Sequence, residues 1–180
     1  MPAQLPNETR YPTHVLREPA LQALLADVAA ASTAPVYLVG GGLRDLLRGV
    51  SPRDIDFAVD GDAEATARRL ADSIDAHVFR LDEARDQLRV VLAEGSVREL
   101  DFAPVKDGSI EADLAGRDFT VNAIAAPVQP DGSLGVLIDP LGGREGGVED
   151  LGLEAVPAVE RLEAGGLVVG EDGGFEIDLA

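Results

Sequence analysis

Two segments of the chain have apolar residues at the spacing of an amphipathic helix. The first begins at Pro19 and is ended by Pro35. Its apolar positions are Leu21, Leu24, Leu25 and Val28. The second, DAEATARRLADSI at residues 62–74, opens with acidic residues, which favour the N-terminus of a helix. A short helix is also expected over residues 43–48, and a helical patch over residues 110–114.

Other segments show the alternating or continuous apolar pattern of β-strands. The expected strands are VYLVG at 36–40, DIDFAV at 54–59, AHVFRL at 76–81, QLRVVLA at 87–93 and VRELDFAPV at 97–105. LGVLIDP at 134–140 is a candidate last strand, and RDFTVNAIAAPV at 117–128 is predicted to be a turn followed by a helix. Strands interleaved with helices predict an α/β (α+β) domain.

The pattern changes after residue 143. The remaining segment is rich in Gly and Glu and weakly periodic, with room for one short helix and a terminal hairpin. We therefore expect three parts: an extended lead-in over residues 1–18, a compact domain over residues 19–143, and an acidic, Gly-rich tail over residues 144–180.

Charge is the strongest signal in the composition. With 15 Lys and Arg against 33 Asp and Glu, the net charge is −18, and Lys106 is the only lysine. Such a chain repels nucleic acid at long range, so a polyanion must be held locally by a few arginines, by metal ions or by another chain. The absence of Cys excludes disulfides and thiolate metal sites, and two His are too few for a histidine-based zinc site. Without a long apolar run or a signal-peptide pattern, a cytoplasmic protein is expected.

Gly40 and Gly41 lie between an expected strand and an expected helix. Glycine lets the backbone approach a ligand closely, and N–H groups at the start of a helix can bind a phosphate. A tight strand-to-helix turn without a ligand explains these glycines equally well. The run of glycines lacks the G-x-G-x-x-G spacing, and no acidic residue ends the next strand in the required role, which argues against a dinucleotide site.

Asp54 and Asp56 have the spacing that places both carboxylates on one face of a strand, about 6.5–7 Å apart. Two such carboxylates can hold one or two divalent cations, and hard oxygen ligands favour Mg²⁺. In so acidic a chain, pairs such as Asp60 and Asp62 also arise by chance. Asp101, on another alternating strand, is a candidate third carboxylate, and three neighbouring acids would repel one another strongly without cations.

Four motifs occur in order from about residue 35 to residue 143. VGGGLRDLLRG followed by RDIDFAV resembles the signature of the nucleotidyltransferase superfamily, a diglycine followed by D-x-D on a strand. RDFTVNAIA at 117–125 resembles the second signature of the class II tRNA nucleotidyltransferases (CCA-adding enzymes) and bacterial poly(A) polymerases. LIDPLGG at 137–143 resembles the stretch that closes the head domain of that family. The resemblance implies a head domain in which helices flank a mixed sheet of about five strands.

The resemblance also implies roles for individual residues. Asp54 and Asp56 would hold the Mg²⁺ ions that bind the incoming triphosphate, whereas Asp101 is assigned as a third catalytic carboxylate from the strand pattern. The residues that the resemblance places around the nucleotide are Gly40, Gly41, Arg44, Asp45, Arg117, Asp118 and Asn122.

Several arginines and acids have simpler explanations. Arg44 and Asp45 can form a surface pair on a helix, and Asp118 can cap a helix that starts at the next residue. Arg85 and Arg89, in DEARDQLRVV, are interpreted as surface charges rather than substrate contacts.

The implied reaction is template-independent addition of CMP or AMP to the 3′ end of an RNA, tRNA above all, with CTP or ATP as substrate. Family members continue into helical regions that read the base and grip tRNA, and motifs of those regions are not found here. An RNA-binding part is therefore expected from elsewhere or from a protein partner. Gly116 also replaces the first arginine of the family's Arg-Arg pair. The alternatives are a non-catalytic nucleotide-binding remnant or partner subunit, and a small nucleotidyltransferase that acts on a protein or a small molecule.

Overall fold

The computed structural model describes residues 18–82, 84, 86–117 and 122–142, together with the backbone of residues 167–169 and 175–177. Its main element is a six-stranded mixed sheet. The strands of this sheet are β1 (Val36–Val39), β2 (Asp54–Val59), β3 (His77–Asp82), β4 (Gln87–Val91), β5 (Glu99–Pro104) and β6 (Ala125–Pro127). The helices are α1 (Pro19–Ala31), α2 (Gly40–Leu47), α3 (Ala63–Ser73) and α4 (Ile110–Ala115). The strand order is β3-β4-β5-β2-β1-β6, in which β2 and β5 pair in parallel and the other neighbours pair antiparallel.

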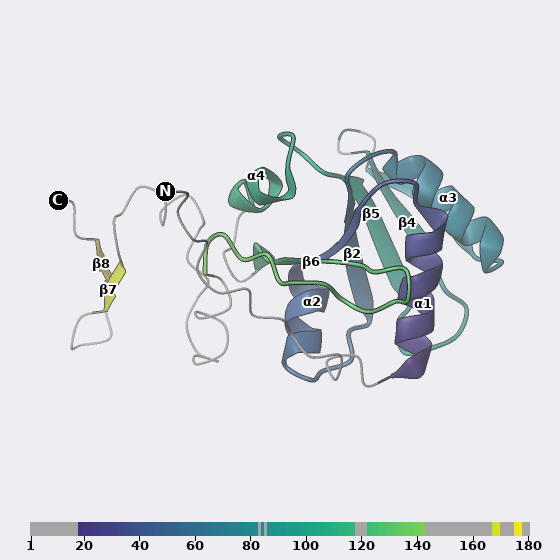
Figure 1. The fold of residues 1–180 in the computed structure, drawn as a ribbon, viewed down its shortest axis with the longest axis horizontal. Coiled ribbons are helices and arrows are strands. Elements are labelled where there is room, and N and C mark those ends of the chain that lie inside the picture. The colour runs from purple at the N-terminus through teal and green to yellow at the C-terminus, as the bar shows by residue number, and fades with distance from the viewer. Residues whose placement is uncertain are drawn as a thin grey trace, which may run out of the picture.

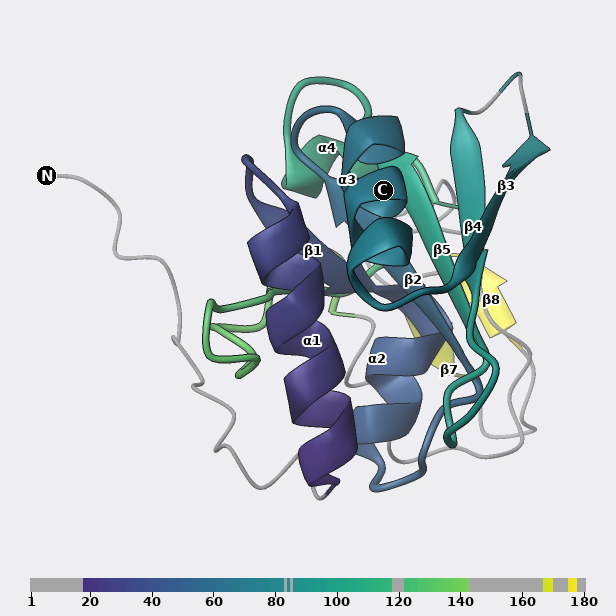
Figure 2. The same cartoon turned by 90° about the vertical axis from the view of Figure 1, so that its right-hand side faces the viewer.

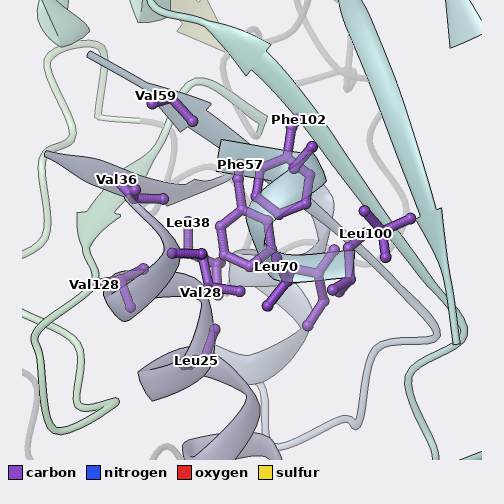
Figure 3. Packing of buried hydrophobic residues seen from close by; sticks show 14 of the residues in the cluster. Leu25, Val28, Val36, Leu38, Phe57, Val59, Leu70, Leu100, Phe102 and Val128 are labelled. Atoms are coloured by element: carbon purple, nitrogen blue, oxygen red, sulfur yellow. The ribbon is translucent and has the colours of Figure 1, made fainter. Parts of the chain in front are cut away.

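One face of the sheet is covered by α1 and α3, which lie side by side (Figure 1 and Figure 2). Leu25 of α1 and Leu70 of α3 are fully buried against the sheet. Beneath them Phe57 of β2 and Phe102 of β5 stack with ring centroids 5.0 Å apart (Figure 3). Each such aromatic buries a large apolar area, so this aliphatic and aromatic layer is the main source of stability.

The opposite face of the sheet is covered differently. Ile110 and Leu114 of α4 pack there against Val39 and Ala58. Because successive residues of a strand point to opposite faces, β2 sends Phe57 into the first layer and its aspartates to this second face. The small α4 leaves Asp54 exposed and Asp56 half-buried.

Two helices begin where the sequence predicts, with side-chain caps. Asp62 accepts a hydrogen bond from the N–H of Ala65 at 2.8 Å, which caps α3. Ser109 accepts one from the N–H of Ala112 at 3.2 Å, which caps α4. Both bonds satisfy donors that lack an intrahelical partner, so local sequence decides these starts.

Other predicted elements are wrong in detail. The helix expected over residues 43–48 already begins at Gly40, so the glycines form its first turn. In RDFTVNAIAAPV, residues 118–121 lie outside the described residues, and Ala125–Pro127 is a strand rather than a helix because it pairs with β1. LGVLIDP makes only isolated bridges, Ala125 to Ile138 and Val128 to Leu134. With β6 included, the main sheet has six strands instead of about five.

The tail contains the predicted terminal hairpin, formed by β7 (Leu167–Val169) and β8 (Phe175–Ile177) in antiparallel pairing. Residues 144–166, where the rest of the tail and its expected short helix would lie, and residues 1–17 of the lead-in fall outside the described residues. In the described ranges, no helix combines the length and apolar character needed to cross a membrane.

Candidate active site

Four acidic residues lie together on the two central strands. Asp54 and Asp56 of β2 are in parallel register with Glu99 and Asp101 of β5, respectively. Residues paired in register point to the same face, so all four lie on the face opposite the α1 and α3 core. The predicted placement of the aspartate pair on one strand face, with Asp101 on the adjacent strand, is confirmed.

The glycine turn begins directly beside Asp56. Val39 pairs with Asp56 across β1 and β2, and Gly40 donates a backbone hydrogen bond to Ile124 at 3.1 Å. Gly40 has φ +71°, a conformation that favours glycine. A Cβ atom there would lie 3.6 Å from Asp56 Oδ2 and 3.6 Å from Arg117 Nη1. The first turn of α2 is therefore held against the carboxylate.

The next two glycines have different surroundings. A Cβ on Gly42 would lie 3.0 Å from the carbonyl oxygen of Asp54 and 3.4 Å from Cα of Ile55, so the helix backbone rests directly on β2. A Cβ on Gly41 would meet only side chains, the nearest being Arg44 Nη2 at 3.6 Å. Gly42 thus serves packing, whereas Gly41 faces the site.

Arg44 joins α2 to residue 122. Its Nε and Nη2 donate to Asp45 Oδ1 at 3.0 and 2.9 Å, and its Nη1 donates to Asn122 Oδ1 at 3.1 Å. The Arg44 and Asp45 side chains are about one third exposed. They do pair with each other, but as part of this network rather than as an isolated surface pair.

Arg117 is held by an acid that the sequence did not single out. Asp113, 8% exposed, accepts from Arg117 Nε at 3.3 Å and Nη2 at 2.9 Å through Oδ2. Its Oδ1 accepts from the N–H of Lys106 at 3.3 Å. These bonds leave Arg117 Nη1 beside Gly40.

Arg89 of β4 is not the surface charge that the sequence suggested. Its Nε and Nη2 donate to the two oxygens of Asp101 at 2.7 and 2.8 Å, and its Nη1 forms an ion pair with Glu99. The hydrogen bonds to Asp101 raise the pKa of the guanidinium above its ordinary value. Arg85, interpreted in the same way, lies outside the described residues.

A pocket of about 210 Å³ opens where these groups meet. Its lining residues are Val39, Gly40, Gly41, Asp56, Phe57, Gln87, Asp101, Ala103, Arg117 and Asn122. The structure thus brings six of the predicted site residues into one pocket. Asp54, Arg44 and Asp45 are not among the described lining residues, and Asp118 lies outside the described part of the chain.

Asp56 has the most perturbed environment among the acids of this pocket. Burial raises the pKa of its carboxyl above the ordinary value, and the charges of Asp101 and Asp54 raise it further. The guanidinium groups of Arg117 and Arg89 lower the pKa in part. A carboxylate in this situation is stabilised by any cation that reaches it.

The oxygen donors of the site fit one class of metal ion. In the described ranges, no three Asp, Glu or His side chains are grouped so that they could hold a metal ion by themselves. Mg²⁺ at nucleotide sites is bound through one or two carboxylates plus substrate phosphates, and Asp54 and Asp56 can supply the carboxylates. The residues therefore fit a magnesium site that a bound triphosphate completes.

Sequence reasoning missed several polar residues of this site. Asp113 had a usable signal, because it precedes Arg117 by four residues at the end of a predicted helix. Arg89 had none, because its pairing with Asp101 depends on the register of β4 against β5. Gln87, which lines the pocket, also had no signal in the sequence.

Comparison with known proteins decides the family. The poly(A) polymerase head domain family matches residues 36–152, a range that includes the glycine turn, both aspartates and Arg117. This chain belongs to that family. The head-domain fold and the family resemblance predicted from the sequence are thereby confirmed.

Several curated members of the family are similar in sequence. A CC-adding tRNA nucleotidyltransferase of Geobacter sulfurreducens is 42% identical over 123 residues, which cover 68% of this chain and 27% of that protein. An A-adding tRNA nucleotidyltransferase of Deinococcus radiodurans is 45% identical over 108 residues, or 60% of this chain and 23% of that protein.

Solved structures of the family show the same fold. A CCA-adding enzyme in complex with ATP has a TM-score of 0.64 at 31% identity and covers 76% of this chain. A Thermotoga maritima CCA-adding enzyme complexed with tRNA has a TM-score of 0.60 at 31% identity and covers 78% of this chain. This chain matches 34% and 32% of those two structures, so it spans about a third of them and about a quarter of the curated relatives.

Proposed function

We propose that residues 19–143 form a nucleotidyltransferase head that adds CMP, AMP or both to the 3′ end of tRNA, with CTP or ATP as substrate. The observation that carries this proposal is the pairing of Val39 with Asp56, which sets the glycine turn against that carboxylate in a pocket that Asp101 also lines. A backbone that phosphates can approach, next to carboxylates that can hold Mg²⁺, suits phosphoryl transfer. The names of the relatives support tRNA as the acceptor.

In the proposed reaction, the 3′ oxygen of the RNA forms a bond to the α-phosphorus of the nucleotide. The bond from that phosphorus to the bridging oxygen of the β-phosphate breaks in line, and pyrophosphate leaves. The proton of the 3′-hydroxyl passes to solvent, so no side-chain base is required. Positioning and charge stabilisation therefore account for catalysis.

The residues of the pocket divide this task. Gly40 and Gly41 let the triphosphate approach the first turn of α2. Arg117 Nη1, beside Gly40, supplies positive charge to the phosphates, and Arg44 supplies more from the next turn. Asn122 and Asp45 brace Arg44. Asp118 is proposed to contact the nucleotide on the strength of its motif alone.

Asp54 and Asp56 are the residues that would hold Mg²⁺ in this site. When bound, the ions would lower the pKa of the attacking hydroxyl and stabilise charge on the leaving oxygens. The raised pKa of Asp56 agrees with this role, because a buried carboxylate among other acids gains most from a cation.

The charge of the chain assigns RNA binding to another part. RNA affinity rests largely on phosphates that Lys and Arg neutralise, and this chain has 15 basic residues against 33 acidic ones. We propose that an RNA-binding part outside residues 19–143, or in a partner chain, grips the tRNA and selects CTP or ATP. Residues 1–18 and 144–180 are then appended segments of the head.

The test is incorporation of each labelled nucleotide, with Mg²⁺, into tRNA that lacks its 3′ CCA. Replacing both Asp54 and Asp56 with Ala should reduce incorporation by about a thousandfold or more. The charge-matched control Asp72→Ala/Glu94→Ala, which removes two exposed acids, should keep wild-type activity. Nucleotide binding without any incorporation would overturn nucleotide transfer by this chain alone and favour a nucleotide-binding subunit or remnant.

A further inference from the structure

The acidic face of β2 and β5 holds more carboxylates than two cations need. Asp54 faces Glu99, and Asp56 faces Asp101, each pair on neighbouring strands. Like charges in register across a sheet are destabilising, so the four acids need counter-charges. The structure supplies one from β4, where Arg89 pairs in register with Asp101.

The geometry of Arg89 divides these acids into two sets. Its guanidinium grips both oxygens of Asp101, at 2.7 and 2.8 Å, in the two-point arrangement typical of strong arginine–carboxylate pairs. The remaining Nη1 pairs with Glu99. Asp101 is 12% exposed and Arg89 is 26% exposed, so water competes little for these bonds. Arg89 is thus bonded to both acids of β5, whereas it acts on Asp56 of β2 only through its charge.

We propose that Arg89 is a positioning residue that keeps Asp101 and Glu99 away from the metal ions, so that Asp54 and Asp56 are the carboxylates that bind them. This inference rests on the proposed function. It reassigns Asp101 from a third catalytic carboxylate to the partner of Arg89. The observation that no three acids of the described ranges are grouped to hold a metal agrees with this division.

A functional reason for the division follows from charge. Without Arg89, cations would distribute over four carboxylates instead of settling beside the glycine turn, where the triphosphate must meet them. With Arg89, the negative charge that is free to bind a cation is concentrated on β2. Replacement of a residue that bonds to the acids around a metal ion commonly changes metal affinity by about 10- to 100-fold.

The test measures binding of Mn²⁺ alone, by electron paramagnetic resonance, so it does not depend on activity. Asp101→Asn should change Mn²⁺ affinity by less than about threefold, whereas Asp56→Asn should weaken it by about tenfold or more. Arg89→Gln should add Mn²⁺ binding or tighten it by about tenfold, because two carboxylates become available.

The double variant Arg89→Gln/Asp101→Asn is the matched control. It has the same net charge as the wild type, since one positive and one negative charge are removed together. If Arg89 acts by holding Asp101, the gain of Mn²⁺ binding seen in Arg89→Gln should fall in the double variant, in which Glu99 is the one carboxylate that is still released. Circular dichroism of each variant shows whether the fold is retained, and the wild-type-like binding expected of Asp101→Asn keeps the proposal testable if Arg89→Gln does not fold.

Two results would overturn the proposal. One is a loss of Mn²⁺ affinity of about tenfold or more in Asp101→Asn, which would make Asp101 a ligand that leaves Arg89 on metal binding. The other is unchanged Mn²⁺ binding in a folded Arg89→Gln variant. Failure of Asp54→Asn and Asp56→Asn to alter Mn²⁺ binding would instead count against the proposed function itself.

Discussion

Arg117 donates through both Nε and Nη2 to a single oxygen of Asp113, four residues earlier, and so presents Nη1 to the glycine turn. Asp113 is almost fully buried and also accepts from the backbone of Lys106. The guanidinium is therefore oriented before any ligand binds, and its orientation depends on α4, which carries Asp113. Preorganised hydrogen-bond donors bind a ligand more tightly than mobile ones because they lose less conformational freedom on binding.

Asp113→Asn should weaken nucleotide binding because the neutral amide holds Arg117 less firmly. We expect KM for the nucleotide to rise by about tenfold, since hydrogen bonds to charged groups contribute about 1.5–3 kcal/mol. Steady-state kinetics at saturating acceptor measure this change. Glu111→Gln, an exposed acid of the same helix, is the matched control and should have wild-type KM. An equal rise of KM in both variants would show that the loss of a negative charge on α4, not the orientation of Arg117, is responsible.

The glycines of α2 should respond differently to alanine. Gly42→Ala should destabilise the domain by about 1–3 kcal/mol, because the new methyl group would press on the carbonyl of Asp54 and force α2 away from β2. Gly41→Ala should keep or slightly raise stability, since alanine favours helices. It should nevertheless weaken nucleotide binding, because its methyl group faces the pocket.

Thermal unfolding and nucleotide titration of the two variants separate these effects. Loss of stability without loss of binding in Gly41→Ala would contradict the assignment of that residue to the phosphate-facing side of the turn.

Replacing Asp56 should stabilise the fold while abolishing activity. The raised pKa of this carboxyl means that the folded state binds its proton more tightly than the unfolded state does. Its contribution to stability is therefore full below the ordinary aspartate pKa and is lost as pH rises through the folded-state pKa. Asn cannot ionise, so Asp56→Asn avoids this loss of stability. At pH 7 its free energy of unfolding should exceed that of the wild type by about 1 kcal/mol, the usual size of a single stabilising change.

Urea unfolding at several pH values checks the prediction. The difference between wild type and Asp56→Asn should shrink as the pH falls towards the ordinary aspartate range. A difference that does not depend on pH would assign the effect to packing rather than to ionisation.

Phe102 offers a test of the two-faced sheet. It neighbours Asp101 in sequence, yet its ring stacks on Phe57 in the layer beneath α1 and α3. Phe102→Leu should therefore lower the free energy of unfolding by about 1–2 kcal/mol. At temperatures where the variant is folded, kcat should equal that of the wild type. A large fall in kcat would mean that the core layer and the site face are not independent.

Much of the candidate site could be predicted because its chemistry is local in sequence. The alternation of DIDFAV alone places both aspartates on one face, and VGGGLRD alone places glycines between a strand and the body of a helix. Strand β6 shows the opposite case. Its alanines favour a helix, but pairing with β1 satisfies the backbone of Ala125–Pro127 and overrides that preference.

The missed contacts depend on strand order and on distant parts of the chain. Arg44 reaches Asn122 across 78 residues, and no periodic pattern records that meeting. Arg89 and Asp101 meet only because β4 and β5 pair in one particular register. A shift of one residue would have turned Arg89 to the other face, as the surface-charge interpretation allowed.

The bond from the N–H of Gly40 to Ile124 has a consequence for the order of folding. Strands β1 to β5 are complete once the chain has been made through Pro104, but the carbonyl that fixes the glycine turn belongs to a later segment. Closing that long loop costs entropy and follows the formation of nearer contacts. A nascent head should therefore possess most of its core before it can hold a nucleotide, and a chain cut short before residue 124 should neither bind nor consume nucleoside triphosphate.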